Sequence, residues 1–166
     1  EAQDRLSKYD LNKFNPWYWN RLKRFVEVAD RDGLVLLHDH YNQHNIIEEG
    51  AHWCDYPWRS ANNINQLGFA EKTVFSGDKR VYMAEQFYDI TRPVIREYHS
   101  KFIRQSVNAF HGSNGVVHSI GLEYTGPLHF MNFWLEEVHA CDNHQLVALT
   151  ATKDVQDAVL KDKKHA

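Results

Sequence analysis

The pattern of apolar and polar positions opens with a helix whose two ends are both marked in the sequence. Residues 15–33 read NPWYWNRLKRFVEVADRDG. Asn15 can cap such a helix, Pro16 suits its first turn, and Gly33 lies just past its end. The residues that recur at helical spacing and form one apolar face are Tyr18, Leu22, Phe25, Val26 and Ala29. We therefore predict a helix over residues 16–32.

Short apolar strands and further helices alternate after it. LVLL at residues 34–37 predicts a strand that is buried on both sides, because all four residues are apolar. A helical pattern over about 83–110 is interrupted near Thr91 and Pro93, where we expect a kink or a new start. The later elements are strands at 116–121 and 146–152 and helices at 126–141 and 154–162. This alternation predicts an α/β fold with about three parallel strands joined by right-handed crossovers.

A long irregular stretch, roughly residues 41–81, carries two tryptophans, Trp53 and Trp58. A loop of this length in a compact domain is usually functional or disordered, and its aromatic content argues against disorder. Flat aromatic faces beside amide side chains suit the apolar faces and hydroxyls of sugars. The alternative is that the loop packs its own aromatic residues into a small core.

Polar side chains gather at the predicted carboxyl ends of the strands. The first strand runs into His38, Asp39 and His40, the second into Glu123 and Tyr124, and the third into Thr150, Thr152, Lys153 and Asp154. In parallel sheets and barrels the carboxyl ends of the strands emerge on one face, where ligands bind. We therefore expect these groups to share one site.

The pair His38 and His40 allows two interpretations. Residues two apart on a strand point to the same side, and a His-x-His pair at a strand end can bind zinc or another divalent metal. Alternatively, both are hydrogen-bonded residues that line a polar cleft. Later strand ends offer Glu123 and Asp154 as further metal ligands.

Glu123 also has two interpretations. A carboxyl group at the end of a buried strand is costly unless it is paired or functional, and partial burial would raise its pKa toward that of a general acid. Alternatively, it stabilises the amino terminus of the helix that follows.

Composition narrows the class of protein. The 166 residues are enough for one domain, and the net charge of −3 provides no basic surface for nucleic acid. No apolar run approaches the roughly 20 residues of a membrane helix, and no signal-peptide profile is visible. Cys54 and Cys141 do not form a disulfide framework. Because the chain starts at Glu1, we expect a processed, trimmed or partial polypeptide.

Three segments resemble the middle of a (β/α)8-barrel glycoside hydrolase of the cellulase-like clan. They are FNPWYWNRLKRFVEVADRDGLVLLHDHY, RPVIREYHSKFIRQSVNAF and VVHSIGLEYTGPLHF. Shorter pieces such as AHWCDYPWR and ATKDVQDAVL are similar to large bacterial proteins assigned to the glycoside hydrolases. The resemblance covers about Lys13 to Lys161 and implies a partial barrel, with residues 1–166 as one segment of it and its strands as barrel strands three to five.

The resemblance also implies roles for particular residues. Glu123 falls where the clan has its acid/base glutamate, although Leu122 and Tyr124 replace the Asn and Pro that usually flank it. His38, His40 and Tyr41 fall where the third strand contributes sugar-binding groups, and we expect Asp39, Trp53, Trp58 and Tyr124 to join them. The nucleophile of the clan follows strand seven; within this chain, Asp39, Glu48 and Asp154 are the substitutes.

Three functions follow as hypotheses. The first is a segment of a retaining hydrolase of plant or algal polysaccharides, secreted or periplasmic, with no cofactor, no nucleic-acid partner and no membrane association. It would associate with the rest of the barrel or with itself. The second is a metal-dependent barrel hydrolase that uses His38 and His40 as ligands. The third is a non-catalytic carbohydrate-binding module.

Overall fold

The structure is a computed structural model that describes residues 8–47, 53, 56–69 and 82–164. The chain forms two compact units. We call Asn15–Tyr41 together with His99–Ala166 the sheet unit, and Glu1–Phe14 together with Asn42–Tyr98 the loop unit. The expectation that residues 1–166 form one segment of a barrel stays a prediction, and Cys54 and Glu48 lie outside the described residues.

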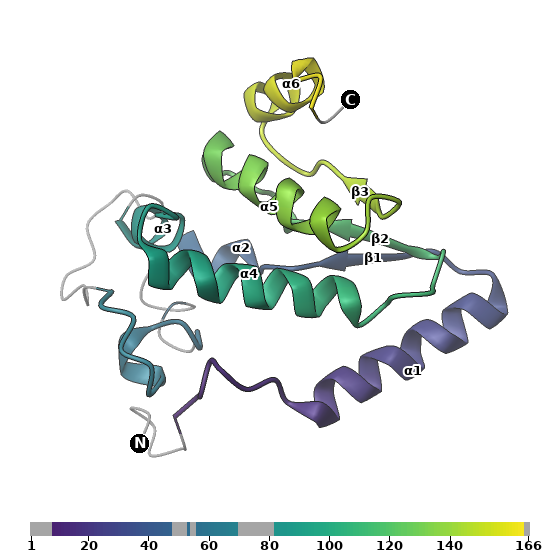
Figure 1. Cartoon of the computed structure of the whole chain (residues 1–166), viewed down its shortest axis with the longest axis horizontal. Coiled ribbons are helices and arrows are strands. Elements are labelled where there is room, and N and C mark those ends of the chain that lie inside the picture. The colour runs from purple at the N-terminus through teal and green to yellow at the C-terminus, as the bar shows by residue number, and fades with distance from the viewer. Residues whose placement is uncertain (1–7, 48–52, 54–55, 70–81, 165–166) are drawn as a thin grey trace. The chain divides into compact units, whose positions relative to one another are not determined.

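The sheet unit contains a three-stranded parallel sheet in the order β1-β2-β3. The strands are β1 (Leu36–Asp39), β2 (Val116–Ser119) and β3 (Leu146–Ala148). Its helices are α1 (Pro16–Asp32), α5 (Leu128–Cys141), α6 (Lys153–Lys161) and the part of α4 (Pro93–Asn108) that begins at His99. Figure 1 shows how helices alternate with the strands along the chain. The predicted α/β class with three parallel strands is confirmed.

The first helix has the predicted ends but a different inner face. The Asn15 side chain accepts a hydrogen bond from the backbone N–H of Trp17, and Gly33 closes the helix at φ 69°, in the left-handed region that glycine adopts without strain. The residues on α1 that are buried are Trp19, Val26 and Ala29. Tyr18 and Phe25, predicted to face the core, are exposed. Trp19 is buried instead, because it lies on the face that meets Phe110 and Val116.

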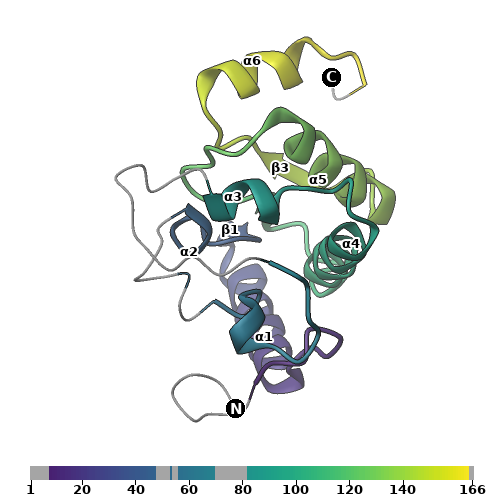
Figure 2. The ribbon, with the colours of Figure 1, turned by 90° about the vertical axis from the view of Figure 1, so that its left-hand side faces the viewer.

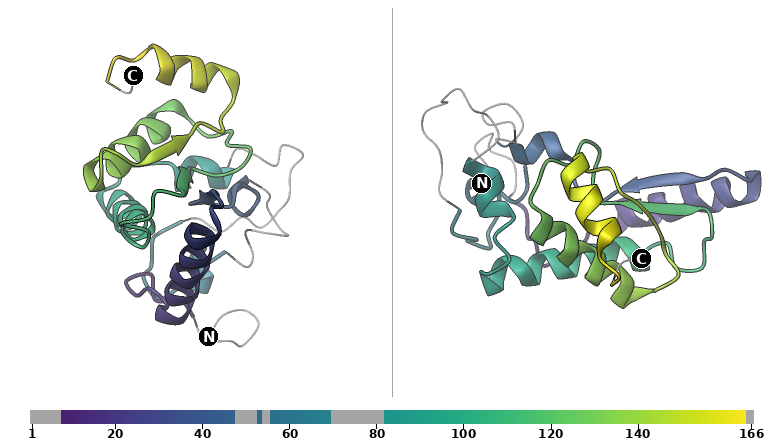
Figure 3. Two further views of the ribbon diagram at one scale, coloured as in Figure 1. Left: turned by 90° about the vertical axis from the view of Figure 1, so that its right-hand side faces the viewer. Right: turned by 90° about the horizontal axis from the view of Figure 1, so that it is seen from above.

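The sheet is covered on one face. Figures 1 and 3 show α4 and α5 on the same side of the strands. The prediction that LVLL at residues 34–37 forms a strand buried on both sides is wrong. The strand begins two residues later, at Leu36, and the side chains of Leu34, Val35 and Leu37 are exposed. The alternation of exposed Leu37 with the partly buried Leu36 and His38 is the period-two pattern of a sheet with one covered face.

Among its described residues, the loop unit has the helical segments α2 (Gln43–Ile47), η2 (Ser60–Asn62) and α3 (Tyr82–Phe87). Figure 2 shows α2 and α3, which are in contact. The carboxamide of Asn63 donates to the carbonyls of Pro57 and Arg59, at 3.0 and 2.8 Å, and so holds the turns around it. The predicted interruption near Thr91 is also present, since α3 ends at Phe87 and α4 begins at Pro93. No helix among the described residues is long and apolar enough to cross a membrane.

Candidate functional site at the carboxyl ends of the strands

Polar groups from the ends of the three strands lie next to one another, but His38 and His40, expected in the same site, point to the opposite face of the sheet from Asp39. Asp39, the last residue of β1, is the register partner of Ser119, the last residue of β2. Beyond the strands, a parallel bridge joins Tyr124 to Ala151, and it keeps the segments that carry Glu123 and Thr150 side by side. The site therefore has Asp39, Ser119, Glu123 and Thr150 at its edge.

Glu123 is exposed and has a left-handed backbone, with φ of 56°. For an L-residue that is not glycine this conformation costs roughly 1–2 kcal/mol. Such strained positions persist where the surrounding structure holds them, and they gather at functional sites. Here the bridge at Tyr124, whose N–H donates to the carbonyl of Thr150 at 2.9 Å, holds the turn.

Hydroxyl groups form a closed network below Glu123. Thr150 Oγ1 donates to the carbonyl of Gly121 at 2.6 Å and lies 2.8 Å from Ser119 Oγ. The backbone N–H of Gly121 donates to Ser119 Oγ at 3.2 Å. Next to this network, Oδ1 of Asp39 is buried with no hydrogen-bond partner in the described chain, and burial raises the pKa of Asp39. These groups tie the ends of β2 and β3 together beside an unsatisfied carboxyl oxygen.

On the helix-covered face of the sheet, three histidines form a cluster. They are His38, His40 and His118, and one nitrogen of each lies within 4.8 Å of the others. His38 and His118 are register partners on adjacent strands, so their side chains point to the same side. The ring of Phe110 packs edge-on against His38, with centroids 4.7 Å apart.

One hydrogen bond fixes the tautomer of His40. The indole Nε1 of Trp134 lies 3.0 Å from Nδ1 of His40. Because an indole N–H can only donate, Nδ1 of His40 accepts, and a neutral His40 carries its proton on Nε2. That Nε2 lies 3.0 Å from Nδ1 of His118 and donates to it. His118 therefore carries its own proton on Nε2, which is buried and makes no hydrogen bond with the described chain.

The cluster is electrically neutral at physiological pH. Burial, and in second place the charge of His118, lowers the pKa of His38 to about 4. Burial also lowers the pKa of His118 to about 4, although the side chain of Gln145 acts in the opposite direction. For His40 the shift is again downward, because the side chain is fully enclosed and two other imidazoles adjoin it. All three rings are thus uncharged.

This geometry weakens the metal hypothesis. A metal-bound histidine normally donates its second ring N–H to an acceptor. His40 instead faces a donor, Trp134, so its lone pair at Nε2 is replaced by a proton. The three side chains have the spacing of a metal site. Because Trp134 donates to His40, however, the histidines are arranged to hydrogen-bond to one another rather than to bind a metal.

Several residues expected to bind substrate are buried instead. Tyr41 is hydrogen-bonded to Nδ1 of His99 at 2.9 Å, and Tyr124 donates to the carbonyl of Pro127 at 2.9 Å. Trp53 and Trp58 are 4% and 7% exposed. Trp53 lies against Phe69 and Tyr56, and Trp58 against Phe87 and Tyr98. The arrangement matches the alternative in which the loop packs its own aromatic residues. Of the predicted substrate-binding residues, Asp39 and His38 keep partial exposure.

Three residues of the site were not predicted. His118 lies inside the second strand, and its equivalence to His38 depends on the register of two strands that are far apart in sequence. Trp134 lies on an apolar helix, where nothing in the sequence marks its indole N–H. Ser119 follows His118 on the strand, so its side chain points to the opposite face, where it lies next to Asp39. The alternation of side chains along a strand could have indicated this face from the sequence.

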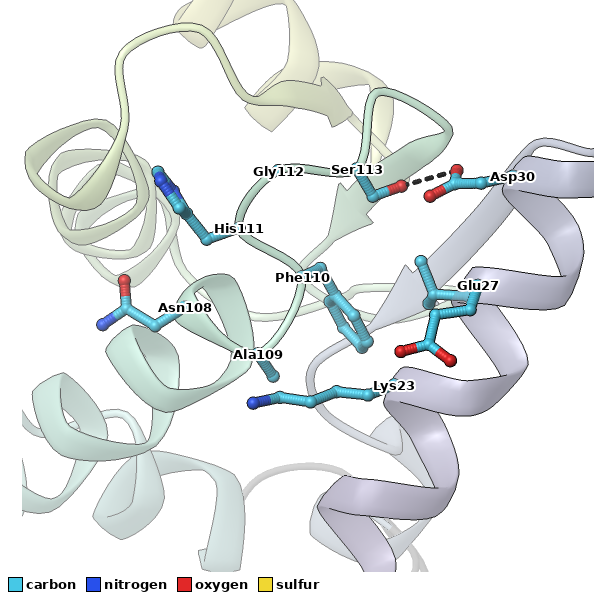
Figure 4. A pocket seen from close by; sticks show the side chains of 10 residues that line it. Lys23, Glu27, Asp30, Asn108, Ala109, Phe110, His111, Gly112 and Ser113 are labelled. Carbon is cyan, nitrogen blue, oxygen red and sulfur yellow. Dashed lines mark hydrogen bonds between the residues drawn. The ribbon is translucent and has the colours of Figure 1, made fainter.

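A hollow lies in the sheet unit near the start of β2 (Figure 4). Lys23, Glu27 and Asp30 from α1 line one side of it, and residues 108–113 line the other. Asp30 accepts a hydrogen bond from Ser113 Oγ at 2.8 Å, which joins α1 to the loop before β2. No polar atom that lines it is both buried and unpaired among the described residues. We therefore interpret these residues as a structural contact between α1 and the loop before β2, and not as a ligand site.

The sequence was compared with known protein families, curated proteins and solved structures. The family described as Domain of unknown function (DUF6298) matches residues 1–166. No curated protein and no solved structure matches the sequence.

Proposed function

We propose that this chain, which belongs to the DUF6298 family, is a segment of a (β/α)8-barrel glycoside hydrolase in which Glu123 is the general acid/base. The observation that carries the proposal is the position of Glu123: it is exposed, it lies in the segment that follows the carboxyl end of the central strand at Ser119, and its backbone has a strained left-handed conformation. The substrate class is a polysaccharide, and its site is formed by the carboxyl ends of β1, β2 and β3.

The topology supports a barrel. Consecutive strands are adjacent and parallel, and one helix follows each of β2 and β3 while α4 precedes β2. This is the repeat from which (β/α)8 barrels are built. An open sheet of three strands leaves two unpaired edges, which proteins ordinarily cover or continue.

The exposed apolar side chains support further strands and helices around this segment. Leu37 and Leu146 are 49% and 57% exposed on the strands, and Trp17 and Phe25 are exposed on α1. Parallel sheets are normally buried on both faces. Additional βα units at both edges would cover these surfaces and would enclose the face of the sheet that carries Leu37 and Asp39.

Glycoside hydrolysis needs two carboxyl groups, one to protonate the leaving oxygen and one to act as nucleophile or base. Glu123 is suited to the first role because it is exposed where the strands end. Asp154, suggested as a substitute nucleophile, is exposed at the start of α6, and a hydrogen bond from Thr152 lowers its pKa. We propose that the nucleophile is a carboxylate of the barrel outside the described residues.

The test is a comparison of Glu123→Gln with wild type in the natural full-length polypeptide. Release of reducing ends from a panel of plant and algal polysaccharides measures turnover, and affinity electrophoresis in the same polysaccharides measures retention. We expect Glu123→Gln to lower turnover by about 10²–10⁴-fold while retention is unchanged. Glu27→Gln, an exposed carboxylate on α1, is the matched control and should keep wild-type turnover.

Two results would redirect the proposal. Wild-type rates in Glu123→Gln would remove Glu123 from the acid/base role. Retention of a polysaccharide by the wild-type protein without any turnover would favour the carbohydrate-binding module, which uses the same face without chemistry.

A further inference from the structure

The turn that carries Glu123 connects two backbone segments, and Thr150 is hydrogen-bonded to both of them. Before the turn, the N–H of Gly121 donates to Ser119 Oγ at 3.2 Å, and the carbonyl of Gly121 accepts from Thr150 Oγ1 at 2.6 Å. After the turn, the N–H of Tyr124 donates to the backbone carbonyl of Thr150 at 2.9 Å. Thr150 therefore holds one end of the turn with its side chain and the other end with its backbone.

The two hydroxyl groups and the backbone of Gly121 form a closed cycle of hydrogen bonds. Thr150 Oγ1 has a single proton, and it donates that proton to the carbonyl of Gly121, which can only accept. In its 2.8 Å contact with Ser119 Oγ, Thr150 is therefore the acceptor and Ser119 the donor. Ser119 Oγ in turn accepts from the N–H of Gly121, which closes the cycle. Each hydroxyl in the cycle donates one hydrogen bond and accepts one.

The segment before the turn is also held from the side of β1. The backbone N–H of Tyr41 donates to the carbonyl of Ile120 at 3.0 Å. At Gly121 the chains come so close that a Cβ would lie 2.4 Å from the carbonyl oxygen of Tyr41. Gly121 is thus fixed by the chain beyond β1 and by the Thr150 hydroxyl, and the exposed residues Leu122 and Glu123 extend from this fixed point.

We propose that Thr150 is a positioning residue: its hydroxyl, through the cycle with Ser119 and Gly121, imposes the left-handed backbone of Glu123 and so directs the Glu123 carboxyl group toward the substrate. The catalytic part of this inference rests on the proposed function. The φ of 56° at Glu123 is unfavourable for a residue with a Cβ, and such a conformation persists where the surrounding structure over-determines it. The two attachments to Thr150 supply that constraint.

The conformational part is tested by NMR on the full-length polypeptide labelled with ¹⁵N-glutamate, with Glu123→Gln used to assign the resonance by its loss. A left-handed residue has a short distance between its amide proton and its own Hα, so wild-type Glu123 should show a strong NOE between them. Thr150→Val keeps the shape but lacks the hydroxyl and should lose this strong NOE, whereas Thr150→Ser should keep it. A weak NOE in the wild type, or a strong one in Thr150→Val, would overturn the proposal.

The catalytic part is tested on the polysaccharide that the wild-type protein hydrolyses in the screen above. Because a misplaced catalytic group slows the chemical step, Thr150→Val should lower kcat by about 10- to 100-fold and keep KM within about threefold. Thr150→Ser should restore most of the wild-type kcat. A residue that only stabilises the fold would leave kcat of the folded protein unchanged, so wild-type kcat in Thr150→Val would remove Thr150 from the positioning role.

Ser113 provides a matched control, because its hydroxyl makes the same kinds of hydrogen bond near the amino end of β2. Ser113 Oγ accepts from the N–H of Gly115 at 3.2 Å and donates to Asp30 at 2.8 Å. Ser113→Ala should keep wild-type kcat, whereas Ser119→Ala opens the cycle and should lower kcat as Thr150→Val does. Equal kcat values in the two serine variants would overturn the role of the cycle.

Failure of the hydrolase proposal has a different signature. It would appear as absent wild-type turnover on every polysaccharide, and the catalytic role of Thr150 would fall with it. The NOE comparison needs no substrate, so it would still decide whether the Thr150 hydroxyl holds Glu123 in the left-handed conformation.

Discussion

Nε2 of His40 lies 3.0 Å from Nδ1 of His118, and the indole of Trp134 decides which of the two carries the proton. The result is a directed chain from Trp134 through His40 to His118. The donor of each hydrogen bond in this series is known because the indole N–H of Trp134, where the series begins, can only donate. The chain joins α5 to the ends of β1 and β2 through the middle of the sheet unit.

The protonated Nε2 of His40 predicts that the wild-type protein has no tight zinc site at the three histidines. Adding zinc to protein purified without chelator should leave the melting temperature unchanged. Trp134→Phe removes the donor and lets His40 move its proton to Nδ1, so this variant should bind zinc more tightly than wild type. Stoichiometric zinc in the wild-type protein, lost on His118→Gln, would show that the tautomer assignment is wrong.

Trp134→Phe should also destabilise the fold. The substitution leaves Nδ1 of His40 buried without its donor, and Trp134 is fully buried. An unsatisfied buried polar group costs about 1–3 kcal/mol, and the smaller ring adds a cavity. Urea unfolding measures the loss. Trp17→Phe, at an exposed position on α1, is the control and should change the free energy of unfolding by about 0.5 kcal/mol or less.

Acid should destabilise the sheet unit through its buried histidines. His38 and His118 have pKa values of about 4 when folded, against about 6.5 when unfolded. In this window the unfolded chain binds more protons, so the stability is complete above pH 6.5 and falls as the pH drops toward 4. Each fully titrated histidine accounts for roughly 3 kcal/mol. Unfolding by urea between pH 7 and 4 measures the slope.

Two variants check the origin of that slope. His144→Gln changes an exposed histidine and should leave the slope unaltered. Asp39 has a raised pKa and adds stability as the pH falls, so Asp39→Asn should make the acid loss steeper. A stability that stays constant from pH 6.5 to 4.5 would contradict the neutral histidine chain.

Replacing Glu123 should separate stability from activity. Glycine adopts φ of 56° without strain, so Glu123→Gly is expected to keep or slightly raise the free energy of unfolding, by about 0.5 kcal/mol, while turnover is lost. Glu123→Gln keeps the strain and should match wild-type stability. A loss of more than 2 kcal/mol in Glu123→Gly would mean that the side chain has a structural role instead.

Gly121 tolerates no side chain. A Cβ at this position would lie 2.4 Å from the backbone carbonyl oxygen of Tyr41, a contact that requires the backbone to move. Gly121 also accepts the Thr150 hydrogen bond, so its displacement would disturb the strand-end network. Gly121→Ala should cost several kcal/mol by urea unfolding, on the scale of overpacked core substitutions. Wild-type stability in this variant would contradict the close approach of the two segments.

The elements of the fold were predictable because their signals are local. The cap at Asn15, the glycine at position 33 and the break before Pro93 are each marked by residues within one turn of the boundary. The parallel arrangement followed from the alternation of helices and strands. The inner face of α1 was not fully predictable, since the helix carries apolar residues on both sides: Phe25, predicted for the core, is exposed, and Trp19, which was not predicted, is buried.

The site was predicted in part, for a similar reason. The sequence indicates that Asp39 and Glu123 lie toward the carboxyl ends of their strands. Knowing where each strand runs in the sequence, and in which direction, is enough for that prediction. The partners of these residues depend on register: Ser119 meets Asp39, and His118 meets His38, only when β1 and β2 align residue by residue. Buried hydrogen-bond donors such as Trp134 become visible only once the packing is known.

The division of the sheet unit into two sequence segments has a consequence for synthesis on the ribosome. β1 leaves the ribosome before its partner β2, which follows only after the whole of Asn42–Tyr98 has been made. At about 5–20 residues per second, the delay is on the order of several seconds. During that interval Leu34–Leu37 lack β2 as a neighbouring strand, so the nascent chain has an unpaired apolar edge that a chaperone would be expected to hold until β2 arrives.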